Sequence, residues 1–135
     1  MSAVPAPYLC TFRVYYEDTD AAGIVYYANY LKFAERARTE WLRSLGFEQA
    51  ALLANEGTGF VVRHCEIDFQ APAKLDDLLS VETCLQEAGK VRMTMRQTIK
   101  RGGKTLALLT VKLACMNHKG KPTRWPEKLV QALMK

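Results

Sequence analysis

The sequence has no apolar run that approaches the roughly 20 residues needed to cross a bilayer. Its first ten residues, MSAVPAPYLC, lack both the basic and the apolar segments of a secretory signal. We therefore expect no stable membrane insertion and a cytoplasmic location. Lys/Arg blocks and low-complexity tracts are also missing, and this argues against a basic nucleic-acid-binding tail.

Histidine and paired cysteine are scarce. The four cysteines are far apart and form no C-x-x-C pair, so buried, reduced thiols are expected. With only His64 and His118 available, a Cys–His nucleophile is disfavoured. The acidic loop residues Glu17, Asp18 and Asp20 lack the alternating ligands of a calcium loop. We expect neither a metal nor a cofactor.

The remaining composition is that of an ordinary globular domain. With 135 residues, 49% hydrophobic and 24% charged, the chain suits one domain spanning residues 1–135. The formal net charge of +5 favours an anionic partner. Arg92, Arg96 and Lys100 lie on one face of a predicted strand with no aromatic residues between them, which disfavours nucleic acid as that partner. A phosphate-bearing ligand or an acidic carrier protein fits better.

Residues 27–45 carry the clearest helical pattern. Apolar side chains recur at helical spacing at Tyr30, Phe33, Ala34, Ala37, Trp41 and Leu45. Gly46 follows, as expected just past a helix end. Shorter helices are predicted for residues 48–55 and 126–134, and residues 1–8 are predicted to be a loose lead-in.

Alternating patterns predict five strands, over residues 9–16, 60–71, 78–88, 91–101 and 105–116. In the second of these, Val61, Cys65, Ile67 and Phe69 are expected to share one face. Short turns between the last four strands predict a meander. The fold class is therefore α+β: a long helix packed on a curved antiparallel sheet of about five strands.

The loop before the long helix contains the candidate chemistry. Glu17, Asp18 and Asp20 are followed by Gly23 and by the predicted helix start near Tyr27. A carboxylate beside the unpaired N–H groups of a helix start is an arrangement that acyl transfer uses. Residues of these types also cap helices and shape loops in proteins without any activity, so spacing alone leaves both interpretations open.

The same segment carries a family resemblance. The pattern D-T-D-x-x-G-x-V-Y-Y-x-x-Y-L-x-F-x-E-x-A-R, within residues 18–38, resembles that of the 4-hydroxybenzoyl-CoA thioesterase-like hotdog proteins. It is most similar to the bacterial acyl-CoA thioesterases encoded with the Tol–Pal system, and the similarity extends along nearly the whole chain. The resemblance implies a hotdog fold and hydrolysis of an acyl-CoA to free acid and thiol.

The resemblance also implies residue roles. Asp20 matches the catalytic carboxylate, as nucleophile or as general base, and the backbone N–H of Tyr27 matches the oxyanion donor. Many close relatives have His where this chain has Tyr27, which leaves substrate preference open. Further candidate substrate-binding residues are Gly23 and Val25 of the same motif, Tyr16 and Tyr26 around the acyl pocket, and Lys90 and Arg92 for phosphates.

Several alternatives stay open on the sequence. A hotdog hydratase or dehydratase is disfavoured because such chemistry usually needs a His, and the long helix contains none. A non-catalytic acyl-CoA-binding module is the other alternative. The thiol donor is either CoA or acyl carrier protein, and the resemblance implies a homodimer or a homotetramer.

Overall fold

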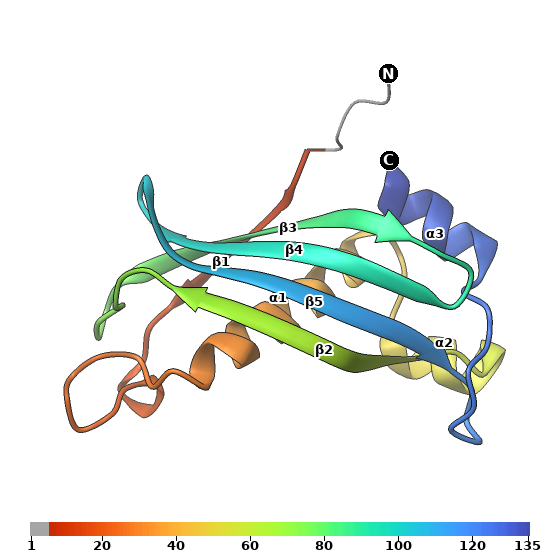
Figure 1. Ribbon diagram of the computed structural model, residues 1–135, viewed down its shortest axis with the longest axis horizontal. Helices are drawn as coiled ribbons and strands as arrows, with labels where there is room; N and C mark the ends of the chain where they lie inside the picture. The colour runs from red at the N-terminus through yellow and green to blue at the C-terminus, as the bar shows by residue number, and fades with distance from the viewer. Residues whose placement is uncertain (1–5) are drawn as a thin grey trace.

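The fold is one antiparallel sheet with a long helix across one face. The computed structural model describes residues 6–135 (Figure 1), so most of the predicted loose lead-in, residues 1–5, lies outside the described residues. The sheet has the order β1-β3-β4-β5-β2. The strands are β1 (Tyr8–Arg13), β2 (Gly59–Phe69), β3 (Leu78–Ala88), β4 (Arg92–Arg101) and β5 (Lys104–Met116). The helices are α1 (Asn29–Ser44), α2 (Gln49–Glu56) and α3 (Glu127–Met134), with a 3₁₀ turn, η1 (Tyr16–Asp18), after β1.

The predicted four-strand meander is wrong for β2. Strands β3, β4 and β5 do follow one another, but β2 pairs with β5 at the edge, and β1 occupies the other side of β3. The reason is the connection over residues 70–77, which crosses the ends of β5 and β4 instead of turning tightly. The N–H groups of Gln70 and Ala71 both donate to Leu106 O, at 2.8 and 3.2 Å. The first strand also ends earlier than predicted, at Arg13, because its partner β3 begins at Leu78.

The predicted faces of β2 are partly wrong because of a β-bulge. The pairing with β5 shifts between Val62 and His64, so one extra residue reverses the alternation. Beyond the bulge, Cys65 and Ile67 face α1 as predicted, opposite the buried Val111 and Leu109. Before the bulge it is Val62, not Val61, that shares a face with them, since Val62 lies opposite buried Leu113.

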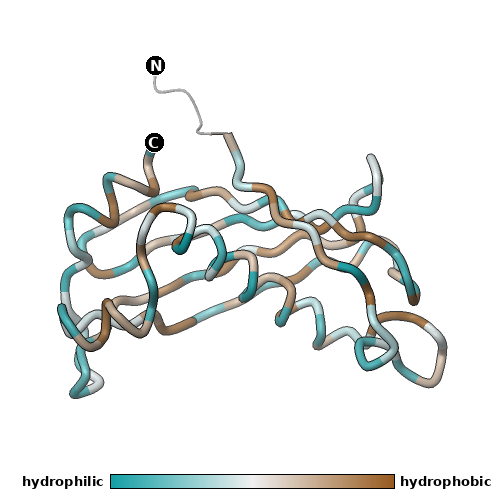
Figure 2. The backbone as a smooth tube through the Cα atoms, turned by 180° about the vertical axis from the view of Figure 1, so that it is seen from behind, coloured by the Kyte–Doolittle hydropathy of each residue, from teal (hydrophilic) through white to brown (hydrophobic). Residues whose placement is uncertain are grey.

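The core lies between α1 and the sheet. The alternating burial predicted for β3, β4 and β5 is confirmed, and Figure 2 shows the corresponding alternation of hydrophobic and hydrophilic segments along the strands. From α1, the apolar stripe Tyr30, Phe33, Ala34, Ala37 and Trp41 is buried against it. The predicted stop at Gly46 is also confirmed, with φ of +90°. The shorter helices form within one residue of their predicted bounds.

Two polar residues, Gln97 and Thr83, are fully buried in this core and bond to each other. Gln97 of β4 is 0% exposed, and its amide Nε2 donates to the α1 carbonyl of Ala34 at 2.8 Å and to Thr83 Oγ1 at 3.0 Å. Its Oε1 accepts from the Arg38 guanidinium at 2.9 Å. Burial lowers the pKa of Arg38 from its usual value, although nearby Glu35 opposes this. Gln97 therefore fixes α1 on the sheet through two hydrogen bonds, to Ala34 and Arg38, while its third bond joins it to Thr83 of β3.

The crossing segment 70–77 is anchored at the same end of the sheet as the start of α1. Arg101 donates to Pro72 O at 3.2 Å and to Asp77 Oδ2 at 2.8 Å. Partial burial raises the pKa of Asp77, but the Lys74 N–H and the Arg101 guanidinium outweigh that effect and hold it below its usual range. The ion pair between Arg101 and Asp77 therefore stabilises the fold fully above the ordinary pKa of an aspartate. This stabilisation is lost as the pH falls through the lowered pKa of Asp77.

We expect Gln97→Leu to destabilise the protein by about 1–3 kcal/mol, because it leaves Ala34 O, Thr83 and Arg38 without their partner in a buried site. The free energy of unfolding from urea titration measures this. Thr98→Val, on the opposite face of the same strand, should change stability by less than about 0.5 kcal/mol. An equal effect of the two substitutions would show that the Gln97 hydrogen bonds do not fix α1.

Candidate active site

One buried carboxylate, that of Asp18, holds the two ends of the loop between β1 and α1 together. Asp18 is 5% exposed, its Oδ2 accepts from the Tyr15 N–H at 2.8 Å, and its Oδ1 accepts from Asn29 Nδ2 at 3.0 Å. Tyr15 precedes the 3₁₀ turn, and Asn29 is the first residue of α1. Asp18 therefore ties the two ends of the loop together and has no oxygen left for chemistry.

Beyond Asp18 the chain forms a small hairpin that presents Asp20. The Tyr26 N–H donates to Asp18 O at 2.9 Å, and Thr19 and Val25 form an antiparallel bridge. The Asp20 N–H donates to Ile24 O at 2.9 Å. Gly23 closes the turn with φ of +81°, a conformation that favours glycine. The hairpin packs on the crossing segment, where the Val25 N–H donates to Ala73 O at 2.8 Å.

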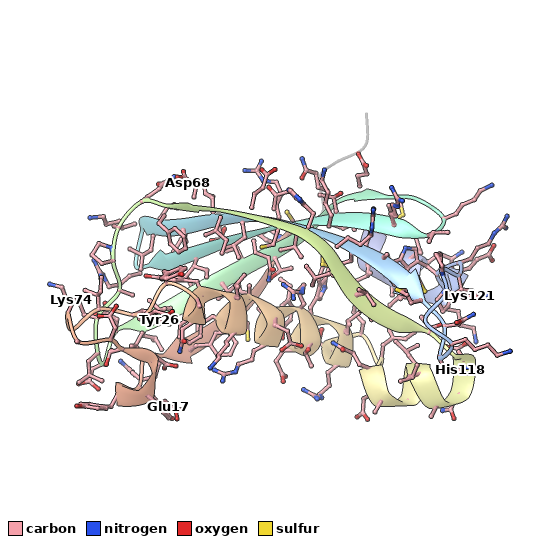
Figure 3. The ribbon with its side chains drawn as sticks, turned by 60° about the horizontal axis from the view of Figure 1, so that its bottom comes forward. Glu17, Tyr26, Asp68, Lys74, His118 and Lys121 are labelled. Atoms are coloured by element: carbon pink, nitrogen blue, oxygen red, sulfur yellow. The ribbon has the colours of Figure 1, made fainter. Side chains whose placement is uncertain are left out.

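The three acidic residues of the loop differ sharply in what surrounds them. Glu17 is exposed on the 3₁₀ turn and points away from the sheet (Figure 3), whereas Asp18 is buried with both oxygens bonded. Asp20 is partly exposed, and its Oδ1 accepts from the Ala22 N–H at 2.9 Å. Within residues 6–135 no group donates to its Oδ2. Asp20 is thus the acidic residue of the loop that is both held in place and free to react.

Unpaired backbone donors lie at the start of α1. The helix begins at Asn29, two residues later than predicted, because Tyr27 and Ala28 form a turn first. The Asn29 N–H donates to Tyr26 O at 2.8 Å, but the N–H groups of Tyr27 and Ala28 donate to no backbone carbonyl of the described chain. Such donors at the positive end of a helix suit a developing oxyanion.

A groove of about 280 Å³ borders this loop. Its walls include Ile24, Val25, Tyr27, Tyr30, Phe69 and Pro72. The backbone N–H of Asp20 donates to the carbonyl of Ile24, so the groove begins next to the hairpin that carries Asp20 and extends along the first turn of α1 to the end of β2. A mostly apolar groove next to the loop that carries Asp20 suits a small molecule with an acyl group.

Of the substrate-binding residues predicted in and around the loop, two belong to the hairpin and two lie outside the groove. Gly23 and Val25 belong to the hairpin, and Val25 is 3% exposed at the groove. Tyr16, 82% exposed, and Tyr26, 45% exposed, do not line the groove; Tyr26 packs on the Tyr27 ring at 4.9 Å. Sequence reasoning did not find Phe69 as a groove residue, since the alternation of β2 marked it only as core.

Lys90 and Arg92 lie at the other end of the sheet from Asp20, around the turn between β3 and β4 (Figure 1). Lys90 lines a cavity of about 490 Å³ together with Arg124, Trp125 and Glu127, whereas Arg92 does not. Within one chain, neither predicted phosphate-binding residue is close to the loop.

The histidines and cysteines lie outside the loop. His64 pairs with Glu66 on exposed β2 at 2.9 Å, and His118 lies at the end of the molecule opposite Glu17 and Tyr26 (Figure 3). Burial raises the pKa of the Cys115 thiol to about 11, so this thiol is neutral near pH 7.

In the part of the chain from residue 6 onward, no three His, Cys, Asp or Glu side chains gather as a metal site. No helix of that part is long and apolar enough to cross a membrane.

The chain is similar in sequence to known proteins. The model of the thioesterase-like superfamily matches residues 14–133. The chain is 48% identical over 121 residues to the acyl-CoA thioesterase YbgC of Haemophilus influenzae, covering 89% of each protein. It is 43% identical over 120 residues to the acyl-CoA thioester hydrolase YbgC of Escherichia coli O6:H1, covering 87% of this chain and 89% of that protein.

A solved structure agrees with the sequence relatives. The crystal structure of a probable thioesterase from Bartonella henselae superimposes with a TM-score of 0.86 at 44% identity, covering 90% of this chain and all of that one. The predicted family resemblance and the predicted α+β architecture are confirmed. The chain is a hotdog-fold protein and belongs to the thioesterase-like superfamily.

Proposed function

We propose that this protein hydrolyses acyl-CoA thioesters, with Asp20 as its catalytic carboxylate. The observation that carries the proposal is the partly exposed Asp20 carboxylate, fixed through Oδ1 and free at Oδ2, on a loop that ends in the unpaired N–H groups of Tyr27 and Ala28. The relatives named above are acyl-CoA thioesterases, and this supports the same substrate class for this chain.

The chemistry needs an attacking group and a donor for the oxyanion. Oδ2 of Asp20 either attacks the thioester carbon directly, forming a mixed anhydride that water then hydrolyses, or takes a proton from the attacking water. In both routes the carbonyl oxygen becomes negative and accepts from the Tyr27 N–H. When the oxyanion collapses, the C–S bond breaks, which leaves the mixed anhydride in the first route and the free acid in the second. The CoA thiolate then takes up a proton. A thiolate leaves readily, so the site works without a nearby histidine.

The edge strand β2 supports a dimer. It presents 11 residues with an unpaired edge, and Val61 and Val62 are 40% and 47% exposed there. Such an edge readily pairs with another strand. Antiparallel pairing of two β2 strands would join two sheets and place Phe69 of one copy near Gly59 of the other. A tetramer of two such dimers stays a prediction.

In this dimer, one end of the sheet in one copy would lie close to the opposite end of the sheet in the other copy. The start of β2 lies beside Trp125, whose ring is 5.0 Å from that of Phe60, and Trp125 lines the cavity of Lys90 and Arg124. Phosphates held there by one copy would then lie on the side of the second copy's Asp20 loop. The phosphates of CoA and the phosphopantetheine of acyl carrier protein both fit this arrangement. The cytoplasmic location stays a prediction.

We expect Asp20→Asn to lower kcat for acyl-CoA hydrolysis by about 10²- to 10⁴-fold, because the amide can neither attack nor take a proton. Thiol release from a panel of acyl-CoAs measures this, with circular dichroism to verify folding. Glu17→Gln removes the same charge from the exposed part of the loop and should leave kcat within about twofold. Binding of acyl-CoA by wild type without turnover would instead favour a non-catalytic module.

We expect Asp18→Ala to lower the free energy of unfolding by about 1–3 kcal/mol, because the Tyr15 N–H and Asn29 Nδ2 lose their acceptor in a buried site. Asp18→Asn keeps one acceptor oxygen and should cost less. Urea titration separates the two variants from Asp20→Asn, which should unfold like wild type. Unchanged stability in Asp18→Ala would contradict the structural role assigned to Asp18.

We expect activity per chain to fall when the protein is diluted until the dimer dissociates, because each site would lose the phosphate contacts supplied by the second copy. Sedimentation velocity and thiol release at matched concentrations test this. A fully active monomer would contradict the assembly described here.

A further inference from the structure

The hairpin that carries Asp20 is attached to the rest of the fold at one place outside its own loop. Among the described residues, the backbone hydrogen bonds of residues 19–25 stay within the loop except one, from the Val25 N–H to Ala73 O at 2.8 Å. An antiparallel bridge between the neighbouring residues reinforces this contact. The position of Asp20 relative to the sheet therefore depends on where the crossing segment lies.

The crossing segment does not fix its own shape. It lies outside the helices and the five strands, and Asp76 within it has φ of +70°, which is uncommon for a residue other than glycine. The Asp76 N–H donates to Val14 O at 3.0 Å, and the Asp76 carbonyl accepts from Arg13 Nη1 at 2.7 Å. A segment with such a backbone keeps its shape only where surrounding groups hold it.

Arg101, the last residue of β4, bonds to this segment on both sides of Ala73. Its Nη1 donates to Pro72 O at 3.2 Å and to Asp77 Oδ2 at 2.8 Å. The same oxygen of Asp77 accepts from the Lys74 N–H at 2.9 Å. The Arg101 and Asp77 side chains are 35% and 22% exposed, so their ion pair is partly shielded from water. These bonds fix the residues before and after Ala73, the residue that receives the hairpin.

We propose that Arg101 positions Asp20 for reaction, acting through the crossing segment. The proposal rests on the proposed function and adds to it a residue outside the loop. Arg101 does not line the groove, and its hydrogen bonds within the described chain go to Pro72 and Asp77. A displacement of the reacting group by about 1 Å can cost about 10²-fold in rate. Loss of the Arg101 contacts should therefore reduce turnover more than it weakens binding of the substrate.

The neighbouring ion pair of Lys100 and Glu82 provides a matched control. Lys100 Nζ lies 3.0 Å from Glu82 Oε2, and the two side chains are 29% and 27% exposed. Lys100 and Arg101 are adjacent on β4, but Glu82 belongs to β3 and not to the crossing segment. Removing the Lys100 cation therefore removes an ion pair of similar exposure without loosening the support of the Asp20 hairpin.

The test compares kcat and KM of the variants for the straight-chain acyl-CoA, from acetyl to hexadecanoyl, that wild type hydrolyses best. Arg101→Met should lower kcat at least about tenfold and leave KM within about threefold, because a misplaced Asp20 fails in the bound complex. Arg101→Lys keeps the cation and should have a kcat at least about threefold above that of Arg101→Met. Lys100→Met should stay within about twofold of wild type. If kcat of Arg101→Met equals that of wild type, or falls no further than that of Lys100→Met, the proposal is overturned.

Amide hydrogen exchange separates this proposal from the proposed hydrolysis. Exchange of the Val25 N–H, relative to amides in the middle of α1, should speed up at least about tenfold in Arg101→Met and stay unchanged in Lys100→Met. If wild type hydrolyses acyl-CoAs but Arg101→Met alters neither kcat nor Val25 exchange, the role of Arg101 fails alone. If wild type shows no turnover while Val25 exchange speeds up as expected, the proposed hydrolysis fails and the hold of Arg101 on the hairpin stands.

Asp77→Asn provides a second variant in case Arg101→Met does not fold. The amide keeps an acceptor oxygen for Arg101 and for the Lys74 N–H but loses the charge. Both effects, the lower kcat and the faster Val25 exchange, should therefore appear in weaker form, at about threefold. A lower kcat with unchanged Val25 exchange would contradict the route through the crossing segment.

Discussion

The arrangement of the site depends on the buried carboxylate of Asp18. It accepts from the backbone just after β1 and from the first side chain of α1, so it closes the loop between them into one rigid unit. The hairpin that presents Asp20 starts from this point, since the Tyr26 N–H donates to the Asp18 carbonyl. Two carboxylates two positions apart thus have different tasks: burial commits one to structure, and partial exposure leaves the other available for chemistry.

Much of the fold and the position of the candidate site could be predicted from the sequence, because the patterns that indicate them are local. The apolar stripe of α1 repeats at helical spacing, and β3, β4 and most of β5 alternate between buried and more exposed residues, so their faces follow directly from the residues. The loop pattern that contains Asp20 and Gly23 is long and specific enough to indicate the family. The chemistry proposed for Asp20 comes from that family resemblance, because spacing alone left the role of Asp20 undecided.

The errors arose where a long-range contact decides the structure. The position of β2 at the edge depends on which strand it pairs with, and the strand pattern does not encode that choice. The bulge near Arg63 adds one residue and so reverses the side-chain alternation of β2. The alternating pattern of the sequence does not indicate the bulge. The separate roles of Asp18 and Asp20 depend on the contact of Asp18 with Asn29, which only the folded loop brings together.

The most direct test of the account is the crystal structure of the Asp20→Asn variant with octanoyl-CoA bound. We expect the thioester carbonyl oxygen to accept from the Tyr27 N–H, within about 3.1 Å, the carbonyl carbon to face the side chain of residue 20, and the acyl chain to lie between Tyr30 and Phe69. A thioester bound away from the loop, or a carbonyl oxygen directed into solvent, would contradict the account.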